Sequence, residues 1–215
     1  MAENNKDYSK KFFTIPNIIC LARIAMIPFF ALFYCQGVQL ASKSHMVAAL
    51  VVLILSGISD NIDGRIARKY NMVSEVGKLL DPTADKLTQI TLAVLMYLTF
   101  QGSGNTWMQH FGWVFLLFLL KEALMLVMGF TLLLLKIVPN PAAIYGKVAT
   151  FVFYVTMALL FLAGPDVGIL QLWNLSLSLP PLFVKIAVVV NLILTFTALF
   201  SYIPDTFRKL TRRTK

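Results

Sequence analysis

Six apolar stretches, each about as long as a membrane-crossing helix, constrain the fold of this chain more than any other feature. The hydrocarbon core of a bilayer needs about 20 consecutive apolar residues in a helix. Of the 215 residues, 58% are hydrophobic and only 13% are charged, whereas a soluble domain carries about a quarter charged residues. The composition therefore predicts an all-α integral membrane protein. We place its six transmembrane helices at residues 15–35, 46–65, 77–99, 111–136, 142–163 and 182–202.

The segments outside these spans are short. Residues 1–12 are polar and basic and predict a short interfacial helix in the cytosol, residues 13–204 form the six-helix membrane domain, and residues 205–215 form a basic cytosolic tail. The first apolar stretch is longer than the apolar region of a signal peptide, and no small-residue cleavage site follows it. We therefore interpret it as an anchor that stays in the protein.

Basic residues distinguish the two sides of the membrane. The first, third and fifth connections contain Lys43 as their only Lys or Arg, whereas both termini and the other connections or their flanks are basic. Because loops rich in Lys and Arg stay in the cytosol, we expect a multi-pass protein of the cell (plasma) membrane with both termini at the cytosolic face. The same pattern explains the net charge of +9 without nucleic acid as a partner.

Four aspartates lie between the second and third apolar stretches. Asp60 and Asp63 are three residues apart, and Asp81 and Asp85 are four apart, so each pair shares one face if its segment is helical. Two helix ends would then bring four carboxylates together at the cytosolic face. Hard oxygen ligands in this number suit Mg²⁺ or Mn²⁺.

Two interpretations of these carboxylates compete. The simpler one is a solvated or salt-bridged helix end, for which nearby cations are available at Arg65, Arg68, Lys69, Lys78 and Lys86. However, one charge at membrane depth costs about 2.5–3.5 kcal/mol, so four bare aspartates would cost on the order of 10 kcal/mol. Two divalent cations would balance four carboxylates and would clamp the attacking and leaving oxygens of a phosphoryl transfer. We therefore favour a metal site.

The spacing of these residues resembles a known signature. The pattern Asp60-x-x-Asp63-Gly64-x-x-Ala67-Arg68, eight residues, Gly77-x-x-x-Asp81-x-x-x-Asp85 is similar to that of the CDP-alcohol phosphatidyltransferases. The resemblance implies a six-helix membrane enzyme that uses two divalent cations, takes a CDP-activated lipid and releases CMP.

The resemblance also implies a role for each matching position. Asp60 and Asp81 would bridge both cations, Asp63 would bind one cation, and Asp85 would bind the other and act as the general base. Positions that match contacts to the CDP-lipid, or that line its site, are Gly64, Ala67, Arg68, Ser74 and Gly77.

Two further stretches suggest the acceptor. Residues 77–86, GKLLDPTADK, look like phosphatidylglycerophosphate synthases and the related CMP-forming cardiolipin synthases. The opening at residues 14–17, followed by Arg23 and Pro28, is similar to that of glycerophosphate-using members and adds Pro16 and Asn17 to the expected CDP-lipid contacts. The implied reaction moves the phosphatidyl group of CDP-diacylglycerol to glycerol 3-phosphate, while phosphatidylglycerol is the alternative acceptor. Membrane lipids are the other expected partners, and a homodimer is left open.

Charged residues inside the spans are the candidates for binding the acceptor's phosphate. We rank Lys147 first, then Lys121, then Arg23, because a charge within a membrane marks a functional site by default. Lys121 occupies a position where the similar enzymes often have Arg. The structural alternatives are an ion pair of Glu122 with Lys121 or Arg23, and a Lys147 side chain that reaches out to headgroups.

A transporter with a cytosolic divalent-cation site is the non-enzyme alternative. The acidic residues lie near one face rather than at mid-membrane. No pair of broken helices occupies corresponding halves of the chain, as in transporters built from repeats. Both observations favour the enzyme.

Overall fold

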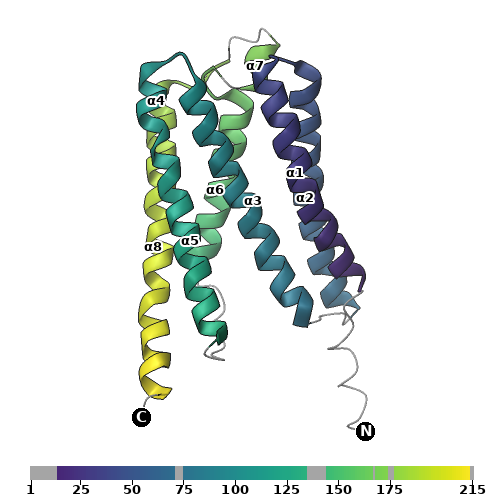
Figure 1. Ribbon diagram of the computed structural model, residues 1–215, viewed down its shortest axis with the longest axis vertical. Helices are drawn as coiled ribbons and strands as arrows, with labels where there is room; N and C mark the ends of the chain where they lie inside the picture. The colour runs from purple at the N-terminus through teal and green to yellow at the C-terminus, as the bar shows by residue number, and fades with distance from the viewer. Residues whose placement is uncertain (1–13, 71–74, 135–143, 167, 174–176, 214–215) are drawn as a thin grey trace. The chain divides into compact units, whose positions relative to one another are not determined.

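A computed structural model describes residues 14–70, 75–134, 144–166, 168–173 and 177–213, and within these ranges the chain forms eight α-helices and no strand. The expected interfacial helix at residues 1–12 lies outside the described part (Figure 1). The helices are α1 Ile15–Gln39, α2 Lys43–Lys69, α3 Glu75–Gly102, α4 Thr106–Gly112, α5 Val114–Leu134, α6 Ile144–Ala163, α7 Ile169–Leu172 and α8 Pro181–Arg213.

The all-helical fold class is therefore confirmed, and the helices suit a membrane. Among the described residues, four stretches are long and apolar enough to cross a bilayer: Ile15–Gln39, Thr106–Gly129, Gly146–Ala163 and Pro181–Ser201. The apolar part of α2, Lys43–Ser59, is shorter, and α3 begins with the charged residues of the aspartate motif. Large apolar side chains such as Phe29, Phe151 and Leu182 are exposed, as lipid-facing residues are. Six membrane spans remain a prediction.

Helix boundaries differ from the predicted spans at several places, and α2 and α3 extend a few residues beyond their spans at both ends. Helix α1 continues to Gln39, and a separate short helix, α4, precedes α5 near the expected start of the fourth span. Helix α8 continues through the basic tail to Arg213, because Lys, Arg and Leu are good helix formers in water as well as in lipid. With 33 residues, α8 is about 50 Å long, which exceeds the ~30 Å hydrocarbon core.

The chain divides into two compact units, Met1–Leu95 and Met96–Lys215. In the first unit, α1 packs along α2 in a helical hairpin (Figure 1). The connecting turn contains Ala41 with a φ of 46°. Near this turn Gly37 is buried against α2, where a Cβ added to Gly37 would lie 2.6 Å from Met46 Cγ and 3.1 Å from Met46 N. The missing side chain at Gly37 therefore allows the two helices to approach.

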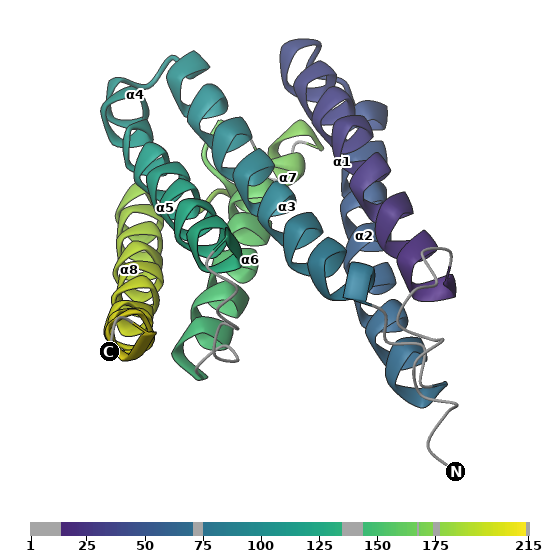
Figure 2. The same cartoon turned by 60° about the horizontal axis from the view of Figure 1, so that its bottom comes forward.

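The second unit contains the end of α3 and helices α4 to α8. Helix α8 packs against α6 and α5, as Figure 2 also shows. A row of aromatic rings joins α3, α5 and α6: the ring centroids of Phe100 and Phe115 are 5.0 Å apart, and those of Phe118 and Phe153 are 5.5 Å apart. These buried rings form much of the core of the second unit.

The hairpin packing yields a prediction with a matched control. Gly37→Ala should lower the thermal unfolding midpoint, because overpacking of a tight contact costs about 1–3 kcal/mol. Gly57→Ala on α2 meets no atom within 4 Å of the added Cβ and should leave the midpoint unchanged or raise it. Thermal unfolding of both variants in one detergent checks this; equal shifts in the two variants would contradict the proposed close approach.

Candidate active site

Helix α3 presents two of the four motif carboxylates. Asp81 and Asp85 lie one turn apart on α3, and their side chains are 59% and 43% exposed. Pro82 lies between them within the helix and has no N–H for the carbonyl four residues earlier. Because their side chains are about half exposed, both carboxylates are accessible to a ligand.

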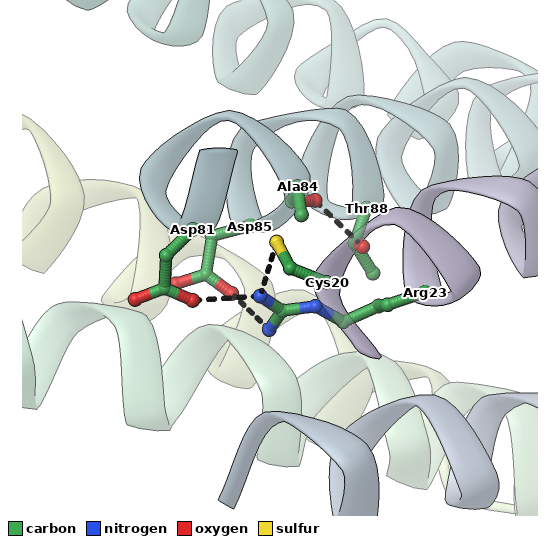
Figure 3. A network of polar contacts seen from close by, with 6 residues as sticks. All are labelled: Cys20, Arg23, Asp81, Ala84, Asp85 and Thr88. Carbon is green, nitrogen blue, oxygen red and sulfur yellow. Dashed lines mark hydrogen bonds and ion pairs between the residues drawn. The ribbon is translucent and has the colours of Figure 1, made fainter. Parts of the chain in front are cut away.

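Arg23 of α1 reaches both carboxylates (Figure 3). Its Nη2 donates a hydrogen bond of 2.7 Å to Asp81 Oδ1, and its Nη1 lies 3.7 Å from Asp85 Oδ1. Nη2 also lies 3.5 Å from the Sγ of Cys20, one turn earlier on α1. A guanidinium group on α1 thus draws two aspartates of α3 to one point.

Burial differs sharply between the two sides of this ion pair. The side chain of Arg23 is only 3% exposed, so its charge must be paired to remain in the low-dielectric interior. The half-exposed aspartates keep part of their surface open. The site therefore combines the buried cation of Arg23 with the accessible carboxylates of Asp81 and Asp85.

The other two motif aspartates, Asp60 and Asp63, belong to α2, and their side chains lie outside the described part of the structure. Among the described residues, no three His, Cys, Asp or Glu side chains converge on one point. The two described carboxylates nevertheless fit a divalent cation, because they are hard oxygen donors that converge on one positive charge. The complete four-carboxylate set remains a prediction.

The expected CDP-lipid contacts are distributed over α1, α2 and α3. Pro16 and Asn17 are buried in the first turn of α1, seven and six residues before Arg23. Gly77 lies in the first turn of α3 and is half-buried. Gly64, Ala67 and Arg68 lie in α2 with side chains outside the described part, and Ser74 falls outside the described residues.

A small apolar hollow lies about one helical turn from the carboxylates. It is lined by Met26, Ile27 and Phe30 of α1, Val52, Leu53 and Ser56 of α2, and Thr88 and Thr91 of α3. Thr88 follows Asp85 by three residues, and its hydroxyl donates to the carbonyl of Ala84 at 2.9 Å. The first unit thus places a charged site beside an apolar space.

The other charged candidates belong to the second unit. Lys121 and Glu122 of α5 form an ion pair with a distance of 2.5 Å from Nζ to Oε1, and their side chains are 10% and 5% exposed. The alternative of an internal ion pair therefore occurs for these two residues, whereas Arg23 forms ion pairs with Asp81 and Asp85. Lys147, in the first turn of α6, is exposed.

Sequence reasoning missed a buried amide in α8. Asn191 is fully buried, and neither its Nδ2 nor its Oδ1 has a hydrogen-bond partner among the described residues. An unsatisfied buried amide costs on the order of 1–3 kcal/mol. The signal was present, because Asn191 interrupts an otherwise apolar run.

A polar cluster at the end of α3 was missed as well. The Oδ2 of Asp166, after α6, accepts hydrogen bonds from the hydroxyl of Ser103 and the amide of Asn105. Asp166 has a positive φ of 59°. These bonds tie two turns of the second unit together, which is a structural role.

Comparison with known proteins places the chain in a family. The family model described as CDP-alcohol phosphatidyltransferase matches residues 13–201. The chain is 37% identical to a CMP-forming cardiolipin synthase of Streptomyces coelicolor over 70% of this chain and 66% of that protein. It is 34% identical to a CDP-diacylglycerol–glycerol-3-phosphate 3-phosphatidyltransferase of Rickettsia felis, over 74% of this chain and 80% of that protein. A protein with the same name from Aquifex aeolicus is 28% identical over 91% of this chain and 97% of its own length.

The family match covers most of the chain and includes every helix that contributes to the carboxylate site. The chain is a membrane transferase that belongs to the CDP-alcohol phosphatidyltransferase family.

Proposed function

We propose that this protein transfers the phosphatidyl group of CDP-diacylglycerol to glycerol 3-phosphate, which gives phosphatidylglycerophosphate and CMP. The observation that carries the proposal is the pair of accessible carboxylates, Asp81 and Asp85, on the helix that completes the family motif. Relatives from Rickettsia felis and Aquifex aeolicus carry the name of this activity, and the second aligns with nearly the whole chain.

Four aspartates would hold two divalent cations, Mg²⁺ or Mn²⁺. Asp60 and Asp81 would bridge the two ions, Asp63 would complete one set of ligands and Asp85 the other. Bound in this way, the cations supply Lewis-acid stabilisation of the attacking and leaving oxygens. Because the aspartates balance the cations, the guanidinium groups of Arg23 and Arg68 leave net positive charge for the pyrophosphate of the donor.

In the reaction, the acceptor hydroxyl oxygen bonds to the phosphorus that carries diacylglycerol. The bond from this phosphorus to the bridging oxygen of the pyrophosphate breaks, and CMP leaves with the bonding electrons. Asp85 accepts the proton of the hydroxyl. A carboxylate among cations is a weak base, so positioning by the surrounding residues supplies most of the acceleration, and general-base help about 10²–10⁴-fold.

The membrane places donor and acceptor on different routes. A six-span arrangement with both termini in the cytosol brings the aspartates to the cytosolic face, where glycerol 3-phosphate arrives from water. The donor enters from the bilayer.

The acceptor's phosphate needs cations, and Lys147 is the first candidate because it is exposed. Lys121 is the second, although its buried pair with Glu122 must open before Lys121 binds an anion. Arg23 ranks last, since Asp81 and Asp85 already share its guanidinium.

A CMP-forming cardiolipin synthase is the second candidate, and the similarity to the Streptomyces coelicolor protein favours it. It would use the same aspartates and the same donor but would take phosphatidylglycerol from the membrane as its acceptor.

An acceptor panel tests the choice between these reactions. Purified protein in detergent with Mg²⁺ or Mn²⁺ and CDP-diacylglycerol should release CMP with glycerol 3-phosphate, but not with phosphatidylglycerol, inositol phosphate or serine. Chromatography of CMP and of the lipid product measures the outcome. Release with phosphatidylglycerol alone would replace the proposal by cardiolipin synthase.

Asp81→Asn should abolish turnover and weaken Mn²⁺ binding, because it removes a ligand proposed to serve both ions. Asp166→Asn is the matched control: it removes an acidic charge from a structural cluster in the second unit and should preserve both properties. Activity and Mn²⁺ titration over a wide concentration range check the pair. Near-normal turnover of Asp81→Asn at any Mn²⁺ concentration would disprove the bridging role.

Lys147→Ala should raise the KM for glycerol 3-phosphate about tenfold or more, and the KM for CDP-diacylglycerol much less, since an ion pair with a phosphate is lost. Lys43→Ala removes an exposed lysine from the start of α2 and should change neither KM. Steady-state kinetics with each substrate varied in turn makes the measurement. Equal rises in both KM values for Lys147→Ala would argue against an acceptor role.

A further inference from the structure

We propose that Arg23 is a resident counter-cation, which neutralises Asp81 and Asp85 when the site holds no divalent cation and shares these carboxylates with the metal when the site is loaded. Arg23 would thus be a positioning residue that competes with the metal for the same carboxylates. The inference rests on the proposed function, because it takes Asp81 and Asp85 as metal ligands.

The first argument comes from the geometry of Asp81. Its Oδ1 accepts a 2.7 Å hydrogen bond from Arg23 Nη2, and in Figure 3 its other oxygen points away from the guanidinium. A carboxylate that bridges two cations commonly uses both oxygens, although a ligating oxygen can still accept a hydrogen bond. Arg23 and the metal would therefore compete for the lone pairs of Asp81 Oδ1.

The second argument comes from the different freedom of the two partners. The side chain of Arg23 is 3% exposed, whereas that of Asp81 is 59% exposed. The aspartate has room to rotate and the arginine does not. Beyond Arg23 on α1, Met26, Ile27 and Phe30 line the apolar hollow, where a guanidinium group would lose its hydration without compensation. Loading of the site is thus expected to shift Asp81 and lengthen its hydrogen bond to a nearly stationary Arg23, which stays within ion-pair distance of Asp85.

The third argument is electrostatic. A metal-free cluster of aspartates is costly because the carboxylates repel one another, and Arg23 reduces this cost because it lies within ion-pair distance of two of them. The same positive charge repels an incoming divalent cation. Arg23 therefore raises the stability of the metal-free protein and lowers its affinity for the divalent cation. A residue with a purely structural role would raise the stability without lowering the affinity.

Replacement of the charge tests the proposal. The full-length protein in detergent is stripped with EDTA and titrated with Mn²⁺, and free Mn²⁺ is measured by electron paramagnetic resonance. Arg23→Gln should bind Mn²⁺ at least about tenfold more tightly than the wild type, because a repelling charge is lost. In EDTA its thermal midpoint should fall below that of the wild type, and saturating Mn²⁺ should restore most of the difference.

Two further variants serve as controls. Arg23→Lys keeps the charge and should bind Mn²⁺ within about threefold of the wild type, because the repulsion remains. Lys43→Gln loses an exposed charge on α2, 17 residues before Asp60 and so about 25 Å along the helix. It should leave both the Mn²⁺ affinity and the midpoint unchanged.

The possible outcomes separate this inference from the proposed function. If the wild type binds no Mn²⁺, the proposed metal site itself fails. If the wild type binds Mn²⁺ but Arg23→Gln binds it equally or more weakly, the counter-cation role fails alone. If Arg23→Gln folds only with Mn²⁺ present, the proposal is supported. If Arg23→Gln folds neither with nor without Mn²⁺, the test uses Arg23→Lys instead. A difference of more than tenfold between the Mn²⁺ affinities of Arg23→Lys and the wild type then overturns the proposal.

Discussion

The cost of placing a charge in a low-dielectric interior governs how this protein arranges its polar residues. Three charged side chains, Arg23, Lys121 and Glu122, are almost wholly buried. In the second unit, Lys121 and Glu122 form an ion pair in which both side chains are buried, so each charge neutralises the other. In the first unit, the charge of buried Arg23 is neutralised by two aspartates whose side chains are about half exposed. A wholly buried pair suits packing, whereas half-exposed aspartates keep anions available for chemistry.

The apolar stretches predicted most of the fold, because membrane spans need length and hydrophobicity and little else. All six long helices overlap the predicted spans. The sequence did not reveal where helices end beyond the apolar region: α8 continues through a basic segment that has no hydropathy signal, and α4 is set off from α5 by a local break at Gly112 and Trp113.

The site was predicted unevenly, for a related reason. Asp81 and Asp85 are neighbours in sequence, so helical periodicity alone places them together. Arg23 was expected to be functional because it is charged within a span and belongs to the opening that resembles glycerophosphate-using members, and the partner considered for it was Glu122 rather than Asp81. Asp81 lies 58 residues away from it, and no periodicity relates two different helices. Asn191 was overlooked although it interrupts an apolar run, because one polar residue does not show by itself whether its side chain is buried.

The separation of Arg23 from Asp81 in sequence has a consequence for biogenesis. A chain that enters the membrane from its N-terminus brings α1 in before α3 has been synthesised. Until then Arg23 lacks Asp81 and Asp85, and an arginine at membrane depth costs about 2.5–3.5 kcal/mol. Helix α1 is therefore expected to remain at the insertion machinery or at the headgroups, where Arg23 stays solvated, until α3 has been inserted. Complete insertion of α1 would then depend on the ion pair that Arg23 forms with Asp81 and Asp85.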